Sequence, residues 1–263
     1  MQLQPLTPVE GRIVIAHVHA YLRQRILDGT LPPGTALSQL QLAQQLGVSR
    51  TPLREALRLL QEERLVLAEH NHRMRVADIN LEELESLYAS RIVLESLALA
   101  LTVPRLSQDE LGALNQELDA MHAASIERDA DTWERGNRRF HALLALHAQD
   151  RIRETIHRSI DASERYRRIK LRTIPHALEI AEAEHKDILA ACCERNSDAA
   201  VERLVRHLAR TALTVIAQVA PEYEPAAVRT ALRLVTGKLN SSGQSNAGRD
   251  SQNGRGQGNP DSK

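Results

Sequence analysis

The stretch of sequence that decides the fold is QLAQQLGVSRTPLREALRLLQEERLV, which runs from Gln41 to Val66. Two segments with leucines at helical spacing flank a tight break at Gly47–Ser49. A short turn containing glycine between two helices is typical of a helix-turn-helix. We therefore predict a short helix that is capped by Ser38 and ends at this break. A second helix is predicted to begin at Arg50–Pro52, where proline suits the first turn, and to end near Glu63.

The flanking residues extend this motif into a winged helix-turn-helix. A first helix is predicted over Val9–Leu27, and the loop LPPGT at Leu31–Thr35 stops it because proline blocks helix continuation. After the motif, Leu65–Leu67 and Arg73–Val76 can pair as a small β-hairpin across a turn at His70–His72. The order of three helices followed by a hairpin predicts a winged helix-turn-helix.

The remaining chain divides by composition and periodicity. Residues 1–8 are predicted to be a loose arm, and residues 9–78 to be the winged helix-turn-helix domain. Residues 79–220 show long helical patterns and no segment of strand period, which predicts an all-helical domain. Residues 221–236 are a C-terminal extension. Residues 237–263 are rich in Gly, Ser, Asn and Gln and are predicted to be a disordered tail.

The all-helical domain is expected to be a bundle of about six helices, so the protein is mainly α. Aromatic residues make up only 2% of the chain, so its core must be built from Leu, Ile, Val and Ala. Breaks between the helical patterns give the helix number. They lie near Pro104–Ser107, Asp129–Asp131, Asp150, Thr173–Pro175 and Asn196–Ser197.

Bulk charge excludes no class of partner and favours none. Lys and Arg together number 34, as do Asp and Glu, so any case for nucleic-acid binding must rest on local placement. The N-terminus lacks a signal pattern and no apolar run approaches the length of a membrane span, so we expect no membrane partner. The two cysteines, Cys192 and Cys193, are adjacent and are expected to be reduced thiols of a cytoplasmic protein.

The helix after the glycine turn carries the residues that can read DNA. In a helix-turn-helix the N-terminal residues of the second helix face base edges in the major groove. Arginine can bind a guanine edge with two hydrogen bonds, and Ser or Thr can bind phosphate. The residues in these positions are Ser49, Arg50, Thr51 and Arg54. The alternative is a scaffold whose winged helix binds only protein. Local charge does not exclude it, because residues 1–78 hold nine arginines against seven acidic residues, which is only a small excess of positive charge.

Polar residues also lie on the apolar stripes of the predicted bundle. Arg91 and Glu95 do so on its first helix. Four more lie on three later helices, namely Asn137, His141, His185 and His207. Buried polar groups need partners, and these four could converge on one metal ion. The alternative is a set of separate, hydrogen-bonded histidines. Spacing alone favours it, because these separations do not form a local ligand motif.

The N-terminal motif resembles the DNA-binding signature of the GntR family, and the resemblance extends to the LPPGT loop and the first helix. It implies that the operator is double-stranded DNA and that the wing tip, His70 and Asn71, reaches the minor groove. It also assigns operator contacts to Ser49, Arg50, Thr51 and Arg54. Leu40 stands where relatives often have arginine, and Asn71 where they often have glycine. Asn71 still tolerates a positive φ.

The helical part resembles the FadR-type C-terminal domain, called FCD. Four segments match in the family's order and at about its spacing: RIVLE at 91–95, NRRFHALLAL at 137–146, EAEHKDILAAC at 182–192 and VRHL at 205–208. The resemblance implies a divalent metal ion, zinc- or nickel-like, bound by Asn137, His141, His185 and His207. Asn137 replaces the commoner aspartate, which lowers the negative charge of the site.

The two resemblances together imply a transcription regulator, a repressor, that is not an enzyme. Its operator affinity would respond to a small carboxylate held beside Arg91 and Glu95, and it would bind a pseudo-palindromic operator as a homodimer. The competing hypothesis is a metal-dependent hydrolase or lyase built on the bundle. Against it, no evident general base accompanies the ligands, and the helix-turn-helix would have no role.

Overall fold

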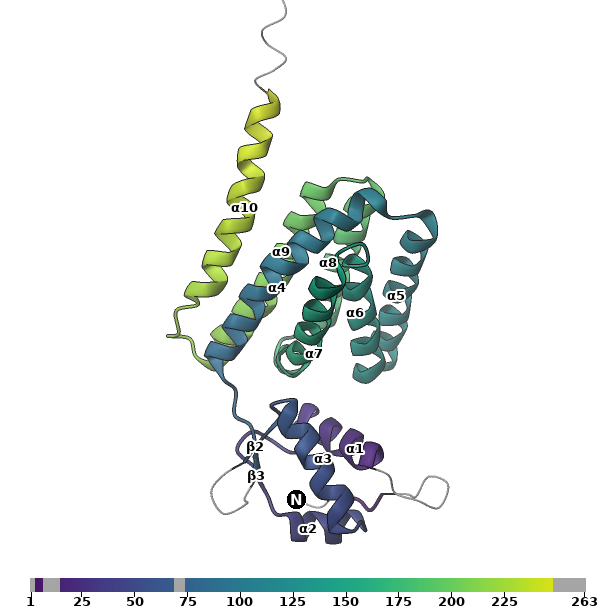
Figure 1. Cartoon of the computed structure of the whole chain (residues 1–263), viewed down its shortest axis with the longest axis vertical. Helices are drawn as coiled ribbons and strands as arrows, with labels where there is room; N and C mark the ends of the chain where they lie inside the picture. The colour runs from purple at the N-terminus through teal and green to yellow at the C-terminus, as the bar shows by residue number, and fades with distance from the viewer. Residues whose placement is uncertain (1–2, 7–14, 69–73, 248–263) are drawn as a thin grey trace, which may run out of the picture. The chain divides into compact units, whose positions relative to one another are not determined.

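The structure, a computed structural model, describes residues 3–6, 15–68 and 74–247. The chain forms two compact units. The first comprises the chain up to Leu84 together with Glu164–Arg172, and the second comprises Glu85–Ser163 and the chain from Thr173 onward. Figure 1 labels helices α1, α2 and α3 and strands β2 and β3 in the first unit and shows the helical bundle of the second.

The first unit is the predicted winged helix-turn-helix. Its elements are α1(Ile15–Leu27), β1(Ala36–Leu37), α2(Gln39–Leu46), α3(Arg50–Glu62), β2(Val66–Ala68) and β3(Met74–Val76). β3 lies between β1 and β2 and is antiparallel to both. The predicted hairpin is confirmed, with Val66 opposite Val76 and Ala68 opposite Met74. β1 was not predicted, because a two-residue strand shows no periodicity.

The turn between α2 and α3 forms as the sequence predicts. Ser38 caps α2 by accepting a hydrogen bond from the backbone N–H of Gln41. Gly47 ends the helix in the left-handed conformation, at φ 67° and ψ 31°, and its N–H bonds to carbonyls of the last turn. A side chain there would strain the backbone, which is why glycine marks this turn. On α3 the buried stripe consists of Leu53, Ala56, Leu57 and Leu60.

The N-terminal arm requires a correction. Leu3 and Leu6 are buried in the core of the first unit, and the N–H of Leu6 bonds to the carbonyl oxygen of Leu46. The arm is therefore packed over residues 3–6, because its leucines bury apolar surface against the core. The predicted start of the first helix at Val9 and the wing tip at His70 and Asn71 lie outside the described residues.

Part of the long helix α7(Asp150–Thr173) completes the first unit. Glu164 bonds to Arg23 of α1 at 2.7 Å. Arg165 donates to the carbonyl oxygens of Arg64, Ala77 and Asp78. The sequence did not predict this packing, because these partners lie far away along the chain.

The second unit is a bundle whose breaks fall where the sequence predicts them. Its elements are α4(Leu81–Thr102), η2(Val103–Arg105), α5(Gln108–Glu127), α6(Ala130–Leu144), α7(Asp150–Thr173), α8(Ala177–Cys193), α9(Ser197–Val219) and α10(Ala226–Ala247). The start of α4 up to Leu84 and the part of α7 over Glu164–Arg172 belong to the first unit. Capping fixes the boundaries: Ser107 and Glu110 form a reciprocal capping box at α5, and Asn196 caps α9. The six helices from α4 to α9 confirm the predicted number.

α10 was not predicted, and it corrects the expected start of the tail at Gly237. The helix continues to Ala247, and residues 248–263 lie outside the described part. Its first turn is held by the buried carboxylate of Glu85, which accepts hydrogen bonds from the N–H groups of Ala227 and Val228 and from Tyr223. Glu85 on α4 thus stabilises the first turn of α10. Once that turn is formed, the helix continues through a segment that forms helix only weakly by itself.

α4 is the most apolar long helix in the described part of the chain. Together with η2 it is long and apolar enough to cross a membrane by length and composition alone, although half of this window is buried inside the protein. Leu84, Tyr88, Ile92 and Leu99 are fully buried. α4 is therefore a core helix of the bundle.

Candidate functional site

The predicted DNA-reading residues share one solvent-exposed face at the start of α3. Ser49, Arg50, Thr51 and Arg54 are all exposed, and the side chain of Arg54 is 64% accessible. The hydroxyl of Ser49 makes no capping hydrogen bond although the residue is the N-cap, so it can donate to a phosphate. The start of α3 therefore presents cations, hydroxyls and helix N–H groups to an anionic partner.

Two residues near this face reduce its positive charge relative to what its position would allow. Leu40 on α2 is 50% exposed, so the position where relatives often carry arginine presents an apolar group to solvent. Arg58 lies one turn beyond Arg54, and sequence reasoning missed it although the spacing of four places it on the same face. Its guanidinium is paired with Glu55 and Glu62, which reduces its charge toward a partner.

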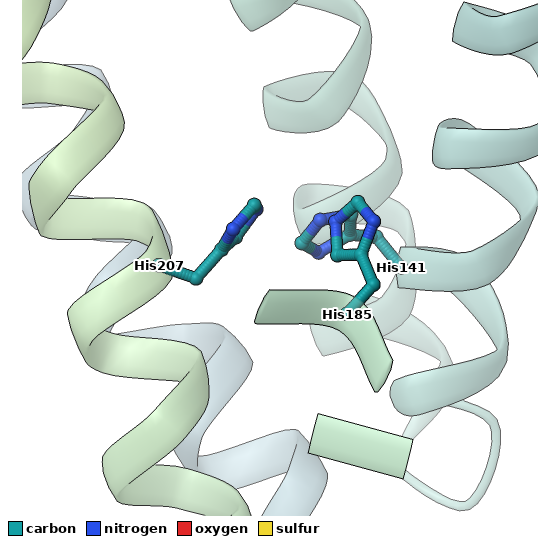
Figure 2. Close-up of side chains that lie close together, drawn as sticks. All are labelled: His141, His185 and His207. Carbon is teal, nitrogen blue, oxygen red and sulfur yellow. The ribbon is translucent and has the colours of Figure 1, made fainter. Parts of the chain in front are cut away.

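Three predicted histidines meet inside the bundle. His141 on α6, His185 on α8 and His207 on α9 point toward one another in Figure 2, and their ligand atoms lie within 4.8 Å of one another. Their exposed fractions are 1%, 0% and 4%. Two nitrogens bound to one zinc ion at ~2.1 Å are at most ~4.2 Å apart. Tetrahedral ligands at this bond length are ~3.4 Å apart, so the three rings lie near one another and would move closer together on binding one ion.

Asn137 tests whether this cluster fits a metal ion. It lies one turn before His141 on the buried face of α6 and is 0% exposed. Neither its Oδ1 nor its Nδ2 has a hydrogen-bond partner among the described residues. A buried amide without partners costs free energy, unless an ion or ligand supplies them. An oxygen donor beside three imidazoles is a suitable set for zinc or nickel, so the residues present fit the group.

Carboxylates orient two of the three histidines. Glu95 Oε2 lies 2.9 Å from His141 Nδ1, and Glu184 Oε2 lies 2.9 Å from His207 Nδ1. When Nδ1–H donates to a carboxylate, the lone pair resides on Nε2, which becomes the ligand atom. Sequence reasoning missed Glu184, although its position directly before His185 is a signal that could have found it.

Aromatic rings hold the third histidine. The ring of His185 stacks on that of Trp133 at a centroid distance of 6.3 Å and lies 4.9 Å from that of Phe140. Trp133 and Phe140 lie on the buried face of α6 that also carries Asn137 and His141. The indole N–H of Trp133 is buried and has no hydrogen-bond partner among the described residues. Like the Nδ2 of Asn137, it is a donor that is available to a ligand.

Arg91 extends the network from α4. Its Nε donates to Glu95 Oε1 at 2.5 Å, so Glu95 links Arg91 to His141. Burial raises the pKa of Glu95, but Arg91 and His141 outweigh it and lower the pKa to about 2. Glu95 is therefore an anion whose two oxygens are engaged. Arg91 is 1% exposed, and its Nη2 has no hydrogen-bond partner among the described residues.

A surface groove of about 610 Å³ lies elsewhere in the bundle, against the other face of α6. Its lining includes Arg139 and Arg153, which are already paired with Glu117 and Asp150. None of the three clustered histidines lines it. The histidine cluster is thus the stronger candidate for an anionic ligand.

Comparison with known proteins matches both halves of the chain. Residues 15–76 match the model of the bacterial regulatory proteins of the gntR family, and residues 86–210 match that of the FCD domain. The HTH-type transcriptional regulator YdhC of Bacillus subtilis is 30% identical over 187 residues, which cover 71% of this chain and 84% of YdhC.

Two further similarities agree. The HTH-type transcriptional repressor GlaR of Escherichia coli is 29% identical over 201 residues, covering 72% of this chain and 90% of GlaR. The crystal structure of a GntR regulator from Rhodococcus sp. RHA1 superposes with a TM-score of 0.63 at 26% identity, covering 80% of this chain and 99% of that one. The matched family and these relatives are transcription regulators rather than enzymes. The chain belongs to the GntR family of bacterial transcription regulators and carries an FCD domain.

Proposed function

We propose that this regulator is a repressor that binds its operator as a homodimer in the cytoplasm. A small carboxylate that binds in the bundle changes the affinity of the protein for the operator. The observation that carries the proposal is the buried cluster of three histidines, one of which lies one turn from Asn137 and is linked to Arg91 through Glu95. The amide of Asn137 and the Nη2 of Arg91 have no hydrogen-bond partner among the described residues. Repression is supported by the name of the relative GlaR.

For the operator, we assign base contacts to Arg50 and Arg54 and phosphate contacts to Ser49 and Thr51. His70 and Asn71 at the wing tip are assigned to the minor groove. An arginine that reads guanine is worth about 1–3 kcal/mol of discrimination. Loss of Arg50 should therefore weaken specific binding about tenfold or more.

Genomic DNA fragments that the protein selects supply the operator for the test. Fluorescence anisotropy then measures the affinity for this DNA at one fixed salt concentration. We expect Arg50→Ala to lose specific binding. The matched control is Arg158→Ala, which removes an arginine that is 83% exposed on α7, and it should bind as wild type. Equal operator affinity in wild type and Arg50→Ala would refute the assignment.

For the sensing site, we assign metal binding to Asn137, His141, His185 and His207, with zinc or nickel as the ion. A bound divalent ion supplies positive charge and open positions for oxygen ligands. The four assigned ligands are neutral, and the nearby carboxylates Glu95 and Glu184 are each paired with an arginine. The site therefore keeps an excess of positive charge, which favours an anionic effector.

Arg91 is the residue that we assign to the effector carboxylate. Its Nη2 is buried and has no partner among the described residues, and guanidinium nitrogens suit carboxylate oxygens. Glu95 holds Arg91 and His141 in place through its two engaged oxygens, so we assign it a positioning role rather than direct contact with the acid.

Arg91→Lys tests this role, because lysine keeps a cation for Glu95 and removes the Nη2 donor. A panel of mono-, di- and tricarboxylates is screened by thermal shift on metal-loaded protein, and hits are carried into the operator assay. At least one acid should change operator affinity by about fivefold or more. Arg91→Lys should bind that acid about tenfold more weakly, with unchanged operator affinity in its absence. An equal response of the two proteins would contradict the assignment.

A further inference from the structure

The N-terminal arm, residues 3–6, has its two ends in the core of the first unit and its middle in solvent. Leu3 and Leu6 are 6% and 8% exposed, whereas Gln4 and Pro5 between them are exposed. Both leucines belong to the hydrophobic core that also contains the buried stripe of α3. Removal of two leucine side chains from water stabilises the arm in this position, so it is a built part of the first unit.

Hydrogen bonds attach the arm to two different helices. The N–H of Gln4 donates to the hydroxyl oxygen of Tyr21 on α1 at 3.1 Å. The N–H of Leu6 donates to the carbonyl oxygen of Leu46, the last residue of α2, also at 3.1 Å. The arm therefore joins α1 to the point at which α2 ends and the turn of the helix-turn-helix begins.

The bond to Leu46 completes the C-terminal cap of α2. The carbonyl groups in the last turn of a helix have no partner within that helix. The turn supplies partners for two of them. The N–H of Gly47 bonds to the carbonyl oxygen of Gln44, and that of Val48 bonds one residue earlier, to Ala43. Leu46 is 0% exposed, so water cannot reach its carbonyl oxygen, and the arm supplies the donor.

We propose that the arm positions the DNA-reading residues, because it holds the turn at Gly47–Ser49 and thereby the direction in which α3 presents Arg50. The inference rests on the proposed operator contacts of α3. Only three residues separate Leu46 from Arg50, so a displacement of the end of α2 also displaces the start of α3. Residues 3–6 carry no charged side chain, so the arm acts on the fit to base edges rather than on attraction to phosphates.

Specific and nonspecific DNA binding depend on different features of the reader. Base contacts require that α3 presents its arginines in one orientation, and loss of one such contact weakens binding about tenfold. Nonspecific binding depends on the charge that the protein brings to the phosphates. An arm that only stabilised the fold would leave both affinities of the folded protein unchanged, whereas an arm that positions α3 changes the first alone.

The double variant Leu3→Asp, Leu6→Asp tests the role, because two carboxylates are not tolerated in an apolar core and the arm should detach. We expect its affinity for the operator to fall about tenfold or more, with unchanged affinity for DNA of unrelated sequence. Leu3→Met with Leu6→Met keeps the burial and should recover the operator affinity. Fluorescence anisotropy at one salt concentration measures both affinities of the full-length chain.

The matched control is Leu27→Ala, at a buried leucine of the same core at the end of α1. It should lower the free energy of unfolding and leave the preference for the operator unchanged. Circular dichroism verifies that each variant is folded at the assay temperature. Leu6→Ala is a milder change that tests the same role if the double aspartate variant does not fold, and it should lose operator affinity in the same direction.

The outcomes separate the arm from the proposed function. If a folded arm variant keeps the operator affinity of wild type, or loses equally on both DNAs, the positioning role is overturned. The proposed operator contacts still stand in that case, provided that Arg50→Ala loses specific binding. A wild type that prefers no selected DNA over unrelated sequence would overturn both.

Discussion

At the scale of single residues, the proposed sensing site would depend on side chains that support the assigned metal ligands. Glu184 is hydrogen-bonded to His207 Nδ1, and its other oxygen lies 3.0 Å from Arg210 Nε. Such a carboxylate fixes the tautomer and orientation of a metal-binding imidazole. Because Arg210 is 55% exposed, it can return to water when Glu184 is removed, at little cost in stability.

We predict that Glu184→Ala weakens metal binding about 10–100-fold, the effect that loss of a supporting partner usually has. Glu184→Gln keeps an acceptor oxygen and should recover part of the loss. Competition with a chromophoric chelator measures the affinity. Glu154→Ala, at a carboxylate that is 67% exposed on α7, is the control and should bind as wild type. Equal affinities in Glu184→Ala and wild type would show that His207 needs no support.

Glu164 makes stability depend on pH. Burial raises its pKa, but Arg23 and the neighbouring arginines outweigh this and lower the pKa from 4.5 to about 2. A group whose pKa is depressed in the folded state stabilises the fold above its unfolded pKa. That contribution, on the order of 3 kcal/mol, is fully present above about pH 4.5 and is lost as the pH falls toward 2.

We therefore predict that Glu164→Gln lowers the free energy of unfolding at pH 7 and makes its decline between pH 4.5 and 3 shallower. Urea denaturation at a series of pH values gives both quantities. The difference between wild type and variant should shrink as the pH falls. A difference that stays constant with pH would mean that the ion pairs with Arg23 and Arg168 do not stabilise the fold.

The sequence pointed to some site residues and could not point to others. The histidines and Asn137 stood out because they are polar on apolar stripes, yet spacing alone could not bring three helices together, and the resemblance to the FCD domain supplied that step. Partnerships such as Glu184 with His207 and Arg23 with Glu164 depend on contacts between distant segments. Periodicity along one helix carries no information about them.

At the scale of elements, local chemistry decided what could be predicted. Ser38, Gly47 and Ser107 mark helix ends by hydrogen bonds made within a few residues, so the boundaries were readable from the sequence. β1 and α10 were missed because both depend on distant partners. β1 is defined by its pairing with β3, and α10 by a carboxylate on α4.

The capping of α10 gives a prediction for an element. Glu85→Ala removes the acceptor for the N–H groups of Ala227 and Val228 and for the hydroxyl of Tyr223. Because Glu85 is buried, the loss should cost about 1–3 kcal/mol. Urea denaturation and helix content from circular dichroism measure it. Glu127→Ala, at an exposed position on α5, should change neither, and a stable Glu85→Ala with full helix content would contradict the role.

At the scale of the whole molecule, a winged helix-turn-helix and an FCD bundle are parts of one chain, and each matches its own family model. Under the proposed function, the first part supplies operator binding and the second supplies the response to a ligand. The proposed regulation depends on metal binding at the buried histidine cluster. Without a bound ion or ligand, the buried amide of Asn137 has no hydrogen-bond partner among the described residues.

The most direct measurement is calorimetric titration of zinc or nickel into chelator-treated, full-length protein. His185→Ala removes one histidine of the cluster, and His157→Ala removes an exposed histidine of α7 as the matched control. We predict one ion per chain for wild type and for His157→Ala, and an affinity about 100-fold lower for His185→Ala, since a buried ligand is lost. A wild type that binds no ion at micromolar concentration, or a His185→Ala that binds it as tightly, would contradict the account.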